Sequence, residues 1–597
     1  MPVYRAPVED MRFLLHDFLD LGKYSNLPGF ADATPDVIDA ILEEGAKLAE
    51  EVLFPLNQVG DEEGCHWKDG VVTVPKGFDG AYKTFVQGGW TGLTCDQEHG
   101  GQGLPTVLGI AFSEMIVSAN MAFGTYPGLT RGAYEAIKRH GDATQKQTYL
   151  PRMASGEWSG TMNLTEPHCG TDLGLIRTKA EPQADGSYRI TGTKIFISAG
   201  EHDLVPNIIH LVLARLPGAP EGTRGISLFI VPKFMVNADG SLGKRNGVVC
   251  GSIEKKMGIK GSATCVMNYD NAVGFLIGEK NRGMRAMFTM MNEARLGVGV
   301  QGLGLSEVAY QNAAKYAKER TQGRSVAGAK EADKSADPII VHPDVRKMLL
   351  TARAFNEGAR ALAYWTALHV DLAHNHPDAE ARAAAEDLLA LMTPVVKAYL
   401  TDTGFESSNW ALQCFGGHGY IRENGMEQYV RDGRITQLYE GTSGIQALDL
   451  VGRKLPQSTG RLLRQFFHPV DSFIQANLEN PALKDIVPNL AKSFARLQQA
   501  TAYIAEQGLK DPEEAAAAAS DFLKMFGLVA MGYMWAQMAA MAAQKLGNGG
   551  AGNKQFFERK LHLARFFMDK ILPDTSSLLS RITAGGASLM AMEADAF

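Results

Sequence analysis

The apolar residues of this 597-residue chain change their spacing along the sequence, and that change limits the folds open to it. Over residues 35–58 they recur at helical intervals, so that one stripe can contain Val37, Ile41, Ala46, Leu48 and Val52. Further on, β-branched residues come in short runs between Gly, Pro, Asn and Asp, which is typical of strands. These runs are 187–198, 208–216, 225–234 and 262–273.

Helical spacing returns after this β-rich part and continues to the end of the chain, with an Ala-rich run at 378–400. The sequence therefore predicts a mostly α fold with a central small β domain. The expected domains are an N-terminal α-helical domain, a middle β domain, a C-terminal α-helical bundle and an additional α-helical domain, over residues 1–160, 161–280, 281–456 and 457–597.

The charge balance argues against nucleic acid and anionic lipid as partners. Lys and Arg total 59 and Asp and Glu total 66, which gives a net charge of −7 and a pI near 6.1. The chain therefore has no general basic field. Its six cysteines are scattered, without a spacing suited to zinc or to a disulfide framework, which favours a reducing cytoplasm.

Neither the N-terminus nor the most apolar stretch indicates a membrane. Glu9, Asp10 and Asp17 interrupt the apolar run that a signal peptide needs, so we expect no secretory or transit segment. Only Met525–Ala543 could be mistaken for a membrane span. Because it is built from Ala, Gly and Met rather than Leu and Ile, we interpret it as a buried helix and expect no membrane span.

Two glycine-rich segments resemble nucleotide loops without having their context. Gly297, Gly299 and Gly302 fit GxGxxG, but a helical stretch precedes them where the dinucleotide motif needs a strand. We interpret these glycines as places where two helices approach closely. The run 547–553, GNGGAGN, lacks the GK[ST] ending of a phosphate loop and is interpreted as a helix connector.

Three separated segments carry the chemistry. They are MNLTEPHCGTDLGLIRTKAE (162–181), MNEARLGVGVQGLGLSEVAYQNAAKYAKERTQGRS (291–325) and QCFGGHGYIRENGMEQYVRDGRITQLYEGTSGIQ (413–446). In order and spacing they resemble the acyl-CoA dehydrogenase family, with its TEPxxGSD, ER-turn and QxxGGxG…RDxRIxxIYEGTxxIQ signatures. The tail beyond residue 455 resembles the extra helical region of the large bacterial subgroup, which includes 3-methylmercaptopropionyl-CoA dehydrogenases.

The resemblance implies the family fold, in which an α domain, a barrel-like β domain and a helical bundle follow one another, here with an extra helical domain. It implies FAD-dependent α,β-dehydrogenation of an acyl-CoA thioester to the trans-2-enoyl-CoA, with an electron-transferring flavoprotein as acceptor. In that reaction a carboxylate removes the pro-R α-proton while the β-hydride passes to flavin N5. The protein must then supply orientation, a base and stabilisation of the enolate.

The family pattern places the base at Glu440, in LYEGTSG. Bound substrate that excludes water would raise the pKa of this carboxyl toward the working range. The ordinary alternative for an isolated Glu near Gly and Thr is a non-catalytic role, as an exposed or salt-bridged residue at the start of a helix. The neighbours Tyr439 and Gly441 are expected to contact substrate. In the family, the enolate oxygen accepts hydrogen bonds from the backbone N–H of the base and from a ribityl hydroxyl of FAD.

The same resemblance implies the FAD contacts. Arg320 matches the Arg that reaches the FAD pyrophosphate of the neighbouring subunit, which implies a homodimer with FAD near the subunit interface. The other expected contacts are Thr165, Phe196 and Ser198 at the flavin ring, Thr171 at the pyrophosphate or substrate, Gln413, Gly416 and Gly417 at the adenine half, and Thr442 beside the base. Without the family, Thr165 would belong to an ordinary turn and Phe196 to a strand core.

Asn292 and Arg295 lie where family members contact CoA, although Arg295 could equally be a structural ion-pair partner. His168 and Cys169 are adjacent without a partner cluster, so we expect no metal. A stripe of methionines, at positions 284, 287 and 291, is expected in the core.

The acyl group and the electron acceptor leave alternatives open. The subgroup resemblance favours 3-methylmercaptopropionyl-CoA, from dimethylsulfoniopropionate degradation, over a medium- or long-chain fatty acyl-CoA of β-oxidation. An acyl-CoA oxidase using O₂ is the next alternative. Glu440 argues against a flavin monooxygenase, and the intact motifs argue against a helical scaffold that has lost the flavin.

Overall fold

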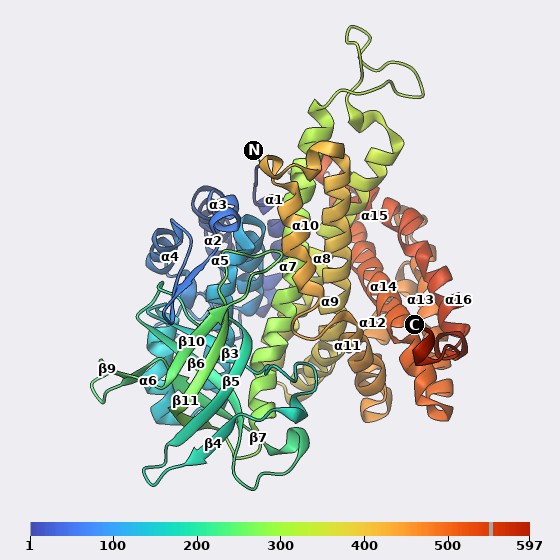
Figure 1. The fold of residues 1–597 in the computed structure, drawn as a ribbon. Coiled ribbons are helices and arrows are strands. Elements are labelled where there is room, and N and C mark those ends of the chain that lie inside the picture. Colours follow the sequence, from blue (N-terminus) through green and yellow to red (C-terminus); the bar gives the residue numbers. More distant parts are fainter. Residues whose placement is uncertain (1, 548–552) are drawn as a thin grey trace. The chain divides into compact units, whose positions relative to one another are not determined.

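The computed structural model describes residues 2–547 and 553–597, and within them the chain forms two compact units. One unit comprises residues 44–297 and holds the sheet; the other comprises residues 1–43 and 298–597 and is helical. The predicted fold class, mostly α with a central small β domain and extra C-terminal helices, is confirmed (Figure 1). The glycine-rich connector predicted at 547–553 falls on residues 548–552, outside the described residues.

Helices of the first unit pack around a long central one. They are α3 Leu56–Glu63, α4 Phe78–Gln87, α5 Thr106–His140 and α6 Ala143–Ala154. A kink interrupts α5 at Asn120, whose side chain accepts a hydrogen bond from the Phe123 N–H at 3.0 Å. Asp142 caps α6 in a reciprocal capping box with Gln145.

The strands of this unit form a seven-stranded sheet and two small hairpins. They are β1 His66–Lys68, β2 Val71–Thr73, β3 Trp158–Asn163, β4 Lys179–Pro182, β5 Tyr188–Ser198, β6 Asn207–Arg215, β7 Ile226–Pro232, β8 Phe234–Val236, β9 Leu242–Arg245, β10 Val248–Ile253 and β11 Thr264–Ile277. The main order is β10-β11-β5-β4-β6-β3, and β7 pairs with both β11 and β6. Because β7 joins two strands that lie apart in that order, the sheet curls toward a barrel.

All four strands expected from the sequence are present, as β5, β6, β7 and β11. Sequence reasoning missed the other strands, β1–β4 and β8–β10, which are at most six residues long and give little periodic signal. The methionine stripe lies as predicted: Met287 is buried in a core cluster, and Met284 and Met291 pack against it.

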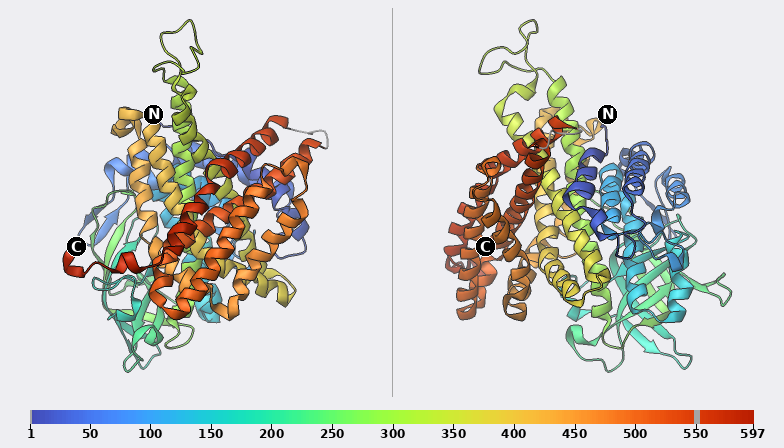
Figure 2. Two further views of the ribbon diagram at one scale, coloured as in Figure 1. Left: turned by 90° about the vertical axis from the view of Figure 1, so that its right-hand side faces the viewer. Right: turned by 180° about the vertical axis from the view of Figure 1, so that it is seen from behind.

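The other unit is an assembly of long helices. They are α1 Val8–Arg12, α2 Pro35–Lys47, α7 Gly283–Glu319, α8 Pro343–Asn375, α9 Ala379–Cys414, α10 Met426–Arg434, α11 Ser443–Asp449, α12 Arg461–Asn477, α13 Val487–Lys510, α14 Pro512–Gly547, α15 Lys554–Lys570, α16 Thr575–Thr583 and α17 Ala587–Met590; the boundary with the first unit falls inside α2 and α7. Helices α8 and α9 run side by side (Figure 1). Helices α13, α14 and α15 lie next to one another in Figure 2.

The predicted stripe is confirmed at Ala46 and Leu48, which are buried, and is wrong at Val37 and Ile41. Val37 is exposed, and the buried side chains of α2 are Ile38, Leu42 and Ala46. These three residues are four positions apart, the spacing that places side chains on one face of a helix. The predicted residues break that spacing, since Ile41 and Ala46 are five positions apart.

Two described helices are long and apolar enough to cross a membrane by composition alone. Besides Pro512–Gly547, which contains the expected stretch, Thr106–His140 also qualifies, so the expectation of a single such segment was wrong. In their most apolar windows 67% and 78% of residues, respectively, are buried inside the protein, as in core helices.

Helices α7 and α9 touch backbone to backbone, as two of the three glycines of the GxGxxG match predicted. A Cβ on Gly302 would stand 2.4 Å from the Leu400 carbonyl oxygen, and one on Gly299 would stand 3.1 Å from that of Val396. On α9, a Cβ on Gly404 would meet the Gly302 oxygen at 2.3 Å. For Gly297 the interpretation was wrong, since a Cβ there meets nothing within 4 Å.

We expect Gly302→Ala to destabilise the protein by about 1–3 kcal/mol, because the helices must separate to admit the methyl group. Gly297→Ala, on the same helix, is the matched control and should be neutral or stabilising by up to about 1 kcal/mol. Urea unfolding of both variants measures the difference. Equal stabilities would mean that the α7–α9 contact is not tight.

Candidate active site

The predicted base, Glu440, has a left-handed backbone. Its φ is +56°, and that of the next residue, Gly441, is +86°. A non-glycine residue in this region is strained by about 1–3 kcal/mol and persists only where its surroundings impose the conformation. Thr442 follows and caps α11, accepting a hydrogen bond from the Ile445 N–H at 3.3 Å.

The loop 437–443 around the base is held from α9. Asp402 accepts hydrogen bonds from the Gln437 side chain at 2.8 Å and from the Ser443 hydroxyl at 2.7 Å, and so joins the two ends of the loop. From α7, Gln301 accepts a hydrogen bond from the Tyr439 hydroxyl. Desolvation, followed by the nearby charge of Glu440, raises the pKa of Tyr439, so the phenol remains a neutral donor.

Arg320 and the glycine loop lie at neighbouring ends of α7 and α9. Tyr316, one turn before Arg320, stacks on Phe415 with ring centroids 4.2 Å apart and an interplanar angle of 16°. Phe415 leads directly into Gly416 and Gly417. Arg320, Gln413, Gly416 and Gly417 are all exposed, and Gly416 has a φ of +58°. The structure thus brings these four predicted residues to one end of the helical unit.

In the other unit, a bulge in β5 exposes Phe196. Two residues, 195 and 196, lie between the partners of Met267 and Cys265, where β11 has only one. Phe196 consequently has a φ of +59° and is 58% exposed. A bulge of this kind redirects a side chain, and here it turns an aromatic ring out of the strand core. The ordinary interpretation of Phe196 as a core residue is therefore wrong.

Thr165 lies beside this bulge. Its carbonyl oxygen accepts a hydrogen bond from the Ile195 N–H at 2.9 Å, and Ser198 pairs with Thr264 at the end of β5. Thr165 and Ser198 are half-buried, whereas Thr171 is exposed. Of the expected CoA contacts, Asn292 is exposed and Arg295 is 7% exposed.

Behind Thr165 lies a buried ion pair that the sequence did not reveal. Glu166 contacts Lys194 at 2.8 Å, and Lys194 is fully buried and also donates to the Leu164 carbonyl at 2.9 Å. Glu166 further accepts hydrogen bonds from the Thr178 hydroxyl and from two backbone N–H groups. Burial alone would raise the pKa of Glu166, but these partners hold it below its ordinary value.

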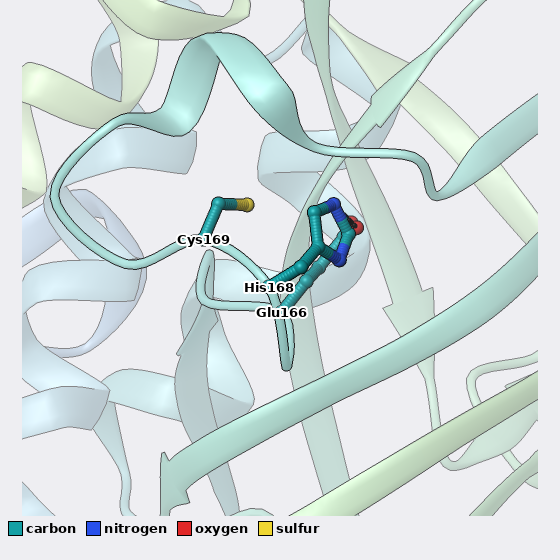
Figure 3. Close-up of side chains that lie close together, drawn as sticks. All are labelled: Glu166, His168 and Cys169. Carbon is teal, nitrogen blue, oxygen red and sulfur yellow. Dashed lines mark ion pairs between the residues drawn. The ribbon is translucent and has the colours of Figure 1, made fainter.

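Glu166, His168 and Cys169 offer ligand atoms within 4.8 Å of one another, on the single turn drawn in Figure 3. Both Glu166 oxygens already accept hydrogen bonds, and His168 Nε2 contacts the Leu175 carbonyl at 2.9 Å. The hydrogen bonds of the Glu166 carboxylate are therefore complete without a metal ion.

Sequence reasoning also missed four residues that hold the loop around the base: the buried Lys397 and Gln446 and the half-buried Gln301 and Asp402. One signal was available for Lys397: it is the single charged residue in the apolar run LMTPVVKAYL. A lysine in such a run of a buried helix needs a partner.

Four consecutive segments of the chain match models of known protein families. Residues 39–157, 161–272 and 281–455 match the family models "Acyl-CoA dehydrogenase, N-terminal domain", "middle domain" and "C-terminal domain", and residues 466–593 match "Acetyl-CoA dehydrogenase C-terminal like". The chain is 43% identical to the 3-methylmercaptopropionyl-CoA dehydrogenase of Ruegeria pomeroyi, over 98% of this chain and 99% of that protein.

Two further similarities cover most of the chain. It is 34% identical to a broad-specificity linear acyl-CoA dehydrogenase of Mycobacterium tuberculosis, over the full length of both. Its fold is similar to that of an acyl-CoA dehydrogenase from Bacillus anthracis complexed with FAD, with a TM-score of 0.75 and 21% identity over 93% of this chain and 89% of that one.

We expect Lys194→Met to destabilise the protein by about 3–5 kcal/mol, because it leaves the Glu166 carboxylate buried without its cation. The folded-state pKa of Glu166 lies below its ordinary value of 4.5, so the stability from its ionised form is present above that pH and is lost as the pH falls through the lower folded value. The gap between wild type and variant should therefore shrink below about pH 4.5. Urea unfolding at pH 7 and pH 4 measures it, with the exposed Lys179→Met as control; equal losses for both variants would contradict the pairing.

Proposed function

The chain belongs to the acyl-CoA dehydrogenase family, and on that premise we propose that it oxidises 3-methylmercaptopropionyl-CoA to its trans-2-enoyl thioester with Glu440 as the base. As a member of this family it is an FAD-dependent oxidoreductase that acts on acyl-CoA. The 43% identity to a relative of that name supports the thioether acyl group. The linear acyl-CoA relative, at 34%, supports a medium- or long-chain substrate as the alternative.

The single observation that carries the assignment of the base is the strained backbone of Glu440 inside a loop fixed at both ends. A positive φ costs free energy at any residue other than glycine, so the hydrogen bonds at both ends of the loop must hold Glu440 in this conformation. A fixed carboxylate can meet the α-proton in one geometry, which lowers the entropic part of the barrier.

The residues present fit FAD. Phe196 is an exposed aromatic ring on a rigid strand, which suits packing on a flavin ring, and Arg320 offers an exposed guanidinium for a pyrophosphate. We propose that Thr165, Thr171, Ser198, Gln413, Gly416, Gly417 and Thr442 complete the FAD contacts, and that Asn292, Arg295, Tyr439 and Gly441 contact the substrate. When bound, FAD accepts the hydride that leaves the β-carbon.

The chain's own residues handle the proton. The Glu440 carboxylate takes the pro-R α-proton, and the bulk of the bound acyl group keeps water away from it, which raises the pKa of the carboxyl for that step. A dehydrogenase must then pass its electrons on, and we propose an electron-transferring flavoprotein as acceptor. The oxidase alternative predicts rapid reoxidation of the substrate-reduced enzyme in air.

We also propose the four-domain division at 160, 280 and 456, a cytoplasmic location and a homodimer. The six free cysteines of the described residues support a reducing compartment. Arg320 and the adjacent glycine loop, all exposed at one end of the helical unit, support a role toward a neighbouring subunit.

Anaerobic titration of the FAD-loaded protein tests the function. We expect 3-methylmercaptopropionyl-CoA to bleach the flavin absorbance at lower concentration than straight-chain acyl-CoAs do. Glu440→Gln should slow bleaching by about 10²–10⁴-fold with FAD retained, because the amide cannot accept the proton. The exposed Glu406→Gln, on α9, is the control. Bleaching by Glu440→Gln at the wild-type rate would exclude this base.

Arg320→Ala should weaken FAD binding by about 10–100-fold, the loss expected for a charge-assisted hydrogen bond to phosphate. Flavin fluorescence on dilution measures the affinity, and sedimentation equilibrium measures the mass. The exposed Arg464→Ala is the control. A monomeric wild-type protein that keeps FAD in full would contradict the proposed role of Arg320 across the interface.

A further inference from the structure

Two buried side chains donate to the carbonyl groups of the base and of the residue after it. Lys397, on α9, donates from Nζ to the Gly441 oxygen at 2.7 Å. Gln446, on α11, donates from Nε2 to the Glu440 oxygen at 2.9 Å and to the Gly441 oxygen at 3.5 Å. Both side chains are fully buried. The two carbonyls that flank the strained peptide are thus held from two different helices.

Burial of the Lys397 ammonium group costs desolvation free energy. The neighbours of Lys397 on α9, Val396, Ala398 and Leu400, are buried and apolar. Removing an ammonium group from water costs several kcal/mol, and an apolar side chain of similar volume would be more stable there. Packing alone therefore does not account for the lysine, and holding the Gly441 carbonyl is a task that its ammonium group can perform.

The two donors determine how the base is presented. With φ values of +56° and +86°, the successive carbonyls of Glu440 and Gly441 are oriented away from a regular helical path. If either hydrogen bond is lost, Glu440 can relax to an ordinary φ and its carboxylate moves with it.

We propose that Lys397 and Gln446 are positioning residues of the dehydrogenation: they hold the backbone of Glu440 so that its carboxylate meets the substrate α-proton. The proposal rests on the proposed function, since it requires Glu440 to be the base. The donors act through Glu440 and need not touch substrate or FAD.

Anaerobic stopped-flow reduction of Lys397→Met and Gln446→Met by the acyl-CoA that best bleaches the wild type tests the proposal. Both changes keep the volume and remove the donor. We expect the limiting rate of flavin reduction to fall by about 10–100-fold, the effect of a small misplacement of a catalytic group, with FAD content unchanged and the substrate Kd within about threefold. Deuterium at the α-carbon should slow the variants more than the wild type, because proton removal becomes more rate-limiting.

Thr393→Val, which removes a buried hydroxyl from the same helix α9, is the control and should reduce at the wild-type rate. If Lys397→Met does not fold with FAD, Gln446→Met alone decides. A reduction rate within twofold of wild type, or a loss matched by loss of FAD, overturns the positioning role while leaving Glu440 as the base. Failure of the wild type to be reduced by any acyl-CoA overturns the proposed function, and the positioning role with it.

Discussion

The close crossing of α7 and α9 is the constraint on which the geometry around the base depends. Gly299 and Gly302 on α7 bring its backbone against the Val396 and Leu400 carbonyls of α9. The residues next to these contacts hold the loop 437–443 around the base. Gln301 accepts a hydrogen bond from the Tyr439 hydroxyl, and Lys397 and Asp402 form hydrogen bonds with the loop from α9. A crossing wide enough to admit a methyl group at Gly302 would move these groups by about 1 Å, which is enough to break a hydrogen bond.

Strain recurs at the two sites that the family pattern singles out, Glu440 and Phe196, both of which have a positive φ. In each case a buried lysine lies close by: Lys397 donates to Gly441, and Lys194 pairs with Glu166 and donates to Leu164, beside Thr165. A buried ammonium is costly, but its geometry is fixed once its acceptors are in place. In both units a buried ammonium group thus donates to a backbone carbonyl close to a residue with a positive φ.

The sequence predicts the long helices and strands and the chemistry of the site well. It predicts less well the short strands, which glycine contacts the partner helix, and which residues hold the base in place. The runs that became β5, β6, β7 and β11 are long and β-branched, whereas β3, β4 and β10 are too short for a periodic signal. The glycine match could be assigned to helix packing, yet Gly297 belongs to the match and touches nothing, because contact depends on the partner helix. Lys397 and Gln446 could not be placed, since their acceptors lie on a loop that only the tertiary fold brings to them.

The additional C-terminal helices pack directly against the helical bundle that precedes them. Helix α14 packs on both α8 and α9, and the Trp535 indole donates to the Ala354 carbonyl at 3.0 Å. On α15, the fully buried Lys560 pairs with Glu357 of α8 at 2.6 Å and also contacts Asp10, which pairs with Arg360 at 2.5 Å. These buried charges balance only when α1, α8 and α15 are all present, since removing one partner leaves the others unpaired at a cost of several kcal/mol. Residues 457–597, which the sequence presents as a separate domain, thus complete the charge balance of the bundle that carries Glu440.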